Sequence, residues 1–138
     1  MTKFEAEVRK FYTNNYGTIG AFKEDLYDTL VLAPREARFI LKQLRKGLID
    51  GATYNAEPDA KGRPCACLVG TIAMARREEI SGFEPSFSFR GIPMDPYRPA
   101  EAWFSKISPG NTPLNNLHAR VAADLIEEFV RSNPKACP

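Results

Sequence analysis

Histidine and cysteine, which supply many metal sites and nucleophilic sites, are scarce in this sequence. The chain has 138 residues, with one histidine and three cysteines. A structural zinc site usually takes four such ligands as two pairs, with two to four residues between the members of each pair. Cys65 and Cys67 are separated by a single residue, and the remaining candidates, His118 and Cys137, lie far downstream. We therefore expect no metal and no cofactor.

Long apolar runs and a large charge of one sign are also missing. No apolar stretch approaches the roughly 20 residues that cross a bilayer. The N-terminal segment 1–11 is charged throughout, so we expect no secretory signal. The odd number of cysteines argues against a disulfide framework, and a formal net charge of only +2 argues against a general polycation. These absences predict a cytoplasmic protein without a membrane partner.

What the sequence does contain is the composition of a globular domain, with apolar residues at helical spacing. Hydrophobic residues make up 43% and charged residues 26% of the chain. We predict a mainly α-helical fold: a single compact domain over residues 1–138, with five or six helices and a short β-hairpin near residues 53–67. Helices are expected at 2–12, 21–32, 34–46, 65–75, 99–107 and 114–131, with a break at 14–20 and a proline-rich irregular loop at 78–99.

A basic stripe follows the helix expected at residues 34–46. Arg35, Arg38, Lys42 and Arg45 recur at intervals of three and four residues, which places them on one side of a helix. With the preceding helix and a hairpin carrying Lys61 and Arg63, this is the order of a winged helix-turn-helix, so nucleic acid is one candidate partner. The alternative is an amphipathic helix whose charges only keep its outer face solvated.

Aromatic side chains set among prolines form the second candidate site. They suit a groove for a peptide or a partner protein, because aromatic residues often dominate the energetics of protein interfaces. The alternative is a loop that folds over the domain and contributes its rings to the core. The residues concerned are Phe83, Phe87, Phe89, Tyr97 and Trp103.

Small and apolar residues surround the cysteine pair in the segment CACLVGTIA. They predict a buried helix in which Cys65 and Cys67 are core residues and Gly70 allows another segment to approach closely. The alternative is a thiol- or metal-dependent enzyme that uses both cysteines with His118, which would require an exposed and activated thiol. A phosphate-binding loop is not expected, because the segment has neither enough glycines nor the lysine that such a loop contains.

The segments CACLVGTIA and PAEAWFSKISPGNTPLNNLHARVAADLIEEF resemble a family of small uncharacterised proteins from phages, prophages and some bacteria. The resemblance covers the C-terminal half, includes a Cys-x-Cys-x-Val-Gly-Thr segment, and leaves out the basic stripe. It implies no catalytic residues, and it favours an accessory or host-interaction protein over a metabolic enzyme.

We therefore expect a non-enzymatic binding or regulatory protein that acts through protein–protein contacts and is encoded by a phage or prophage. A nucleic-acid-binding protein is the first alternative, and the enzyme built on Cys65, Cys67 and His118 is the second.

Overall fold

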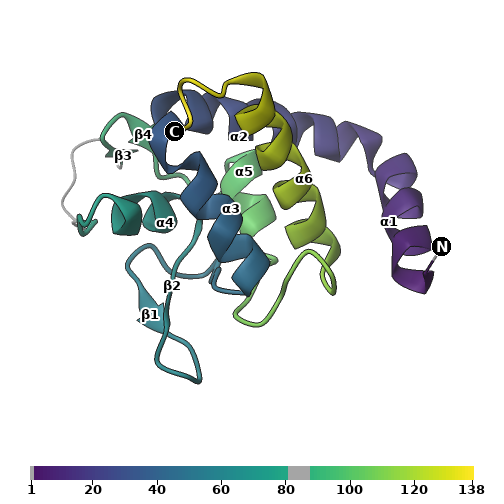
Figure 1. Ribbon diagram of the computed structural model, residues 1–138, viewed down its shortest axis with the longest axis horizontal. Helices are drawn as coiled ribbons and strands as arrows, with labels where there is room; N and C mark the ends of the chain where they lie inside the picture. The colour runs from purple at the N-terminus through teal and green to yellow at the C-terminus, as the bar shows by residue number, and fades with distance from the viewer. Residues whose placement is uncertain (1, 81–87) are drawn as a thin grey trace.

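The computed structural model describes residues 2–80 and 88–138, and it confirms a mainly helical fold with short antiparallel strand pairs (Figure 1). The helices are α1 (Lys3–Asn14), α2 (Tyr16–Leu32), the 3₁₀ helix η1 (Pro34–Glu36), α3 (Ala37–Lys46), α4 (Leu68–Ala75), α5 (Pro99–Phe104) and α6 (Leu117–Ser132). The strands are β1 (Glu57–Pro58), β2 (Pro64–Cys65), β3 (Ser88–Phe89) and β4 (Ile92–Pro93), paired as β1–β2 and β3–β4.

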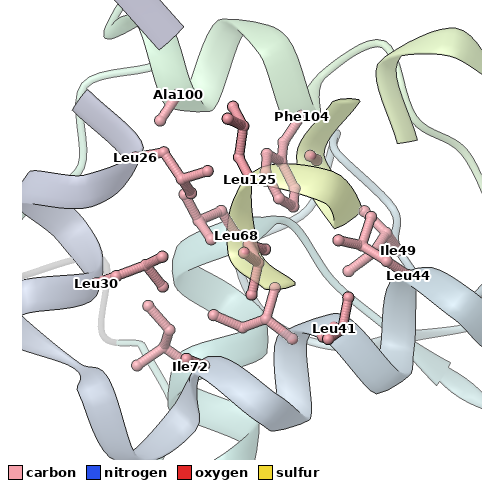
Figure 2. Close-up of a cluster of buried hydrophobic side chains, with 14 of the residues drawn as sticks. Leu26, Leu30, Leu41, Leu44, Ile49, Leu68, Ile72, Ala100, Phe104 and Leu125 are labelled. Carbon is pink, nitrogen blue, oxygen red and sulfur yellow. The ribbon is translucent and has the colours of Figure 1, made fainter. Parts of the chain in front are cut away.

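One hydrophobic core holds the described elements together. Helix α3 packs on α6 and α4, while α2 packs on α5, so the apolar stripes of these helices converge (Figure 2). The expected inward face of α3 is confirmed, since Ala37, Ile40 and Leu44 are fully buried. Figure 2 labels Leu26, Leu30, Leu41, Leu44, Ile49, Leu68, Ile72, Ala100, Phe104 and Leu125 of this cluster.

The break expected at residues 14–20 is wrong in extent, because only Asn15 interrupts the helices. The Asn15 amide and its side-chain nitrogen both donate to the Phe11 carbonyl at 3.0 Å, which closes α1, and α2 then begins at Tyr16. Gly17 and Gly20 are tolerated inside α2 because both lie on its exposed side. Figure 1 shows α1 extending away from the other helices at this junction.

Helix ends follow the expected chemistry at three positions and differ at a fourth. The Thr2 side chain caps α1, Gly47 ends α3 with a left-handed φ of 71°, and Pro99 opens α5. The last helix begins at Leu117 instead of residue 114, because the Asn116 side chain caps it by accepting from the Ala119 amide at 2.8 Å.

The hairpin expected near residues 53–67 is confirmed as β1–β2. Its turn is held by the Asp59 carboxylate, which accepts from the Lys61 and Arg63 amides at 2.9 and 2.8 Å. A second hairpin, β3–β4, occupies part of the expected irregular loop. Arg90 and Gly91 form its turn with positive φ values of 50° and 85°, a conformation that suits a two-residue hairpin turn.

Candidate functional site

An open groove of about 670 Å³ lies where the start of α2, helix α5 and the start of α6 meet. Its walls come mainly from aromatic and small side chains, with few polar groups. Such a composition is typical of ligand and peptide sites in proteins. The lining residues are Phe11, Asn15, Gly17, Thr18, Ala21, Phe22, Pro99, Ala102, Trp103, Lys106 and His118.

The aromatic wall of the groove is held by ring contacts between three helices and the first residues of α6. Trp103 stacks on Phe22 with ring centroids 4.5 Å apart and an interplanar angle of 5°. The His118 ring lies 4.6 Å from Trp103 and 5.3 Å from Phe11, both at steep angles. The Trp103 indole nitrogen also donates to the His118 carbonyl at 2.9 Å. These contacts fix the rings before anything binds.

The opposite wall is low because α2 presents small residues there. Gly17, Thr18 and Ala21 are exposed and line the groove, so no large side chain of α2 closes it. An added Cβ at Gly17 would find no atom within 4 Å. The groove is therefore accessible along this side of α2.

The electrostatics of the groove depend on Lys106 and His118. Lys106 is exposed in the turn that follows α5, and His118 is half-buried. Burial, together with the positive charge of Lys106, lowers the pKa of His118, so its ring is neutral at pH 7. A neutral imidazole offers one hydrogen-bond donor and one acceptor to a ligand.

The expected set of aromatic binding residues does not form a single surface. Phe89 is 1% exposed and belongs to the core, so its ring is not presented to a partner. Tyr97 is 88% exposed, and Trp103 lines the groove although it is only 5% exposed. Phe83 and Phe87 lie outside the described residues.

The basic stripe is partly engaged by the C-terminal part of the chain. Arg38 donates to the Cys137 carbonyl at 2.9 Å, and Arg45 forms an ion pair with Glu127 at 3.0 Å. Arg35 and Lys42 are exposed without such a contact among the described residues. In the β1–β2 hairpin, Lys61 is exposed, and Arg63 is exposed but paired with Asp59 at 2.8 Å.

The three cysteines are buried free thiols, which confirms the expected burial of Cys65 and Cys67. The helix expected at 65–75 begins only at Leu68, because Cys65 pairs in β2 and Cys67 is the N-cap of α4. Burial and nearby carboxylates raise the pKa of both, and for Cys67 the rise is large. Its sulfur caps α4 by accepting from the Gly70 amide at 3.4 Å. Because the protonated thiol is a weak nucleophile and ligand, these positions suit core residues. Residues 2–80 and 88–138 contain no group of three or more His, Cys, Asp or Glu arranged for a metal ion.

A buried carboxylate that the sequence did not indicate lies beside Cys67. Glu101 is 4% exposed in α5, and it accepts from the Val69 amide at 3.3 Å. It lines a second cavity of about 210 Å³ with Tyr54 and Cys67. Burial raises the pKa of Glu101 to about 7, because its neighbouring hydrogen bonds and Arg98 offset desolvation only in part. Glu101 lies within the segment PAEAWF, which has the pattern of an ordinary amphipathic helix start. The spacing of its residues therefore does not mark Glu101 as a buried carboxylate.

Comparison with known proteins identifies no relative. The chain matches no protein-family model, no curated protein and no solved structure. The resemblance to small phage and prophage proteins therefore stays a prediction. Within the described part of the chain, no helix is long and apolar enough to cross a membrane.

Proposed function

We propose that this chain is a non-catalytic binding protein that docks an apolar segment of a partner protein in the groove between α2, α5 and α6. The observation that carries the proposal is an open groove whose half-buried rings, Phe11 and His118, rest on the buried stacked pair Phe22–Trp103. Rigid aromatic rings in a concave site are typical anchors of protein interfaces.

The arrangement of the two walls supports a peptide-like occupant. The aromatic wall is fixed by ring contacts and by the Trp103–His118 hydrogen bond, so little side-chain entropy remains to be lost on binding. The low wall at Gly17 and Ala21 lets a backbone approach α2 closely. A cavity of about 670 Å³ accommodates several side chains of such a segment.

A random peptide library displayed against the immobilised full chain tests this proposal. We expect peptides with micromolar dissociation constants whose binding falls at least about tenfold in Ala21→Trp, because the indole would fill the groove. Ala6→Trp is the matched control, since Ala6 is also an exposed helical alanine but does not line the groove. Failure to select any peptide, or peptides that bind Ala21→Trp as well as the parent chain, would contradict the proposal.

A nucleic-acid-binding function is the second candidate. It is favoured by the order α2, α3 and β1–β2, and by the projection of the hairpin from the helices beside α3 (Figure 1). Arg35 on η1 and Lys42 on α3 are exposed cations, and Lys61 is another on the hairpin. The engagement of Arg38 and Arg45 reduces the number of cations left for phosphate contacts.

Salt-dependent binding to a DNA duplex tests this second candidate. The double variant Arg35→Ala/Lys42→Ala is expected to weaken binding and to lower the slope of log K against log salt concentration by about 2. The control removes two exposed cations from α1, as Arg9→Ala/Lys10→Ala, and should leave the slope nearly unchanged. Equal slopes in all three proteins would exclude α3 as the contact surface.

A further inference from the structure

The residues that line the groove supply a positive charge and no negative charge. Among the residues that line it, Lys106 carries the one formal charge at pH 7, and no lining residue is a carboxylate. The lysine is exposed, and its positive charge adds to the effect of burial in lowering the pKa of His118. An anionic group bound in the groove would therefore meet an attractive field and no opposing carboxylate from the lining.

A neighbouring cavity shows that a positive charge without a nearby carboxylate is not a general property of the surface. This neighbouring cavity has about 620 Å³ and shares Gly17 and Ala21 of α2 with the groove. Its lining carries Lys23 together with the carboxylates Asp124 and Glu128. Two cavities of similar size thus differ in charge, and the one beside Lys106 is cationic.

The imidazole of His118 adds a polar position next to Lys106. Neither of its ring nitrogens has a hydrogen-bond partner among the residues that the structure describes, although the ring is half-buried. Its face is fixed against Trp103 and Phe11, so the nitrogens can turn only slightly. A group that enters beside Phe11 can therefore form a hydrogen bond to His118 and an ion pair with Lys106.

We infer that the groove selects a partner segment with an aromatic side chain next to a carboxylate. The ring packs against Phe11 and Pro99, which line the groove and are not buried, and the carboxylate pairs with Lys106 and accepts a hydrogen bond from His118. This inference rests on the proposed function, and it adds the chemistry of the anchor. A segment with a cationic group in the same place would be repelled by Lys106.

Two small probes of the same shape test the charge selection. Naphthalene-2-carboxylate and 2-naphthylmethylammonium share the aromatic ring system and differ in the sign of the charge. The chain contains one tryptophan, so the indole N–H signal of Trp103 in an NMR titration reports groove binding without ambiguity. We expect the carboxylate probe to shift this signal saturably, and to bind about two- to fivefold more tightly than the ammonium probe at low salt.

Substitutions at Lys106 then test whether this residue causes the preference for the carboxylate probe. Lys106→Ala is expected to remove the difference between the probes, and Lys106→Arg should retain it because the charge is kept. Added salt should narrow the difference in the parent chain, since Lys106 is exposed. Equal binding of the two probes, an unmoved indole signal, or a preference that survives in Lys106→Ala would each overturn the inference.

A failure of the charge selection can be distinguished from a failure of the proposed function. Selected peptides without acidic residues, whose binding is still lost in Ala21→Trp, would leave the proposed function standing and contradict the charge selection. A carboxylate probe that binds as expected, in a chain for which no peptide can be selected, would support the charge selection and contradict the proposed function.

Discussion

Replacing Glu101 by glutamine is expected to stabilise the protein by about 3 kcal/mol at pH 8. The folded state raises the pKa of Glu101 from 4.5 to about 7, so it favours the protonated, uncharged side chain. Each unit of difference between the folded and unfolded states corresponds to about 1.4 kcal/mol. Glutamine has the same shape and can accept the same hydrogen bond from the Val69 amide, but it carries no charge to desolvate.

The pH dependence gives this prediction its sign. Below about pH 4.5, Glu101 is protonated in both states and contributes no difference between the parent chain and the variant. As the pH rises from there to about 7, the unfolded chain releases this proton before the folded chain does, so the free energy of unfolding falls. The gain from Glu101→Gln should therefore appear across this interval and level off above it.

Urea denaturation of both proteins at a series of pH values from 4 to 8 measures the effect. Glu57→Gln is the control, because Glu57 is exposed in β1 and its replacement should change stability by less than about 0.5 kcal/mol. A Glu101→Gln variant that is no more stable than the parent at pH 8 would show that the buried carboxylate is fully compensated in the folded protein.

Replacing Gly70 by alanine is expected to destabilise the protein by about 3 kcal/mol or more. A Cβ at this position would overlap with the Tyr54 carbonyl oxygen and lie 2.8 Å from the Ala66 Cβ. Both obstacles belong to backbone or to a rigid short side chain, so neither can move aside without displacing α4 or the segment before it.

Gly20→Ala is the matched control for Gly70→Ala. Both glycines are helical, but an added Cβ at Gly20 would find nothing within 4 Å. Alanine there should stabilise the protein by about 0.5–1 kcal/mol, because it lowers the backbone entropy of the unfolded chain. Chemical denaturation should therefore move the two midpoints in opposite directions, and similar small shifts for both would contradict the close approach at Gly70.

Much of the fold could be predicted because local patterns decide it. The stripe Ala37, Ile40 and Leu44 predicted α3, and the turn sequence DAKGR predicted the β1–β2 hairpin. The break predicted at 14–20 is longer than the observed one at Asn15, because glycines favour a break only where the helix gains little from packing. Gly17 and Gly20 lie on the exposed side of α2, where their low helix propensity is outweighed by the packing of its buried face.

Less of the candidate site could be predicted, because the groove combines distant segments. Trp103 was expected at a partner surface and His118 in a thiol site, but nothing in their spacing predicted that their rings lie 4.6 Å apart. Phe11 and Phe22 read as ordinary members of helical apolar stripes. Their contact with Trp103 depends on how α1 and α2 pack against α5, which is a property of the tertiary structure.

The indole N–H signal of Trp103, followed while a selected peptide is added, tests the central claim most directly. If the peptide docks in the groove on Phe11 and His118, whose rings contact Trp103, this single signal shifts and saturates with the same dissociation constant as the binding itself. It should stay unmoved when the peptide is added to Ala21→Trp, where the parent indole can be identified by comparison of the two free proteins. A peptide that binds the parent chain tightly and leaves the Trp103 signal unchanged would contradict the account.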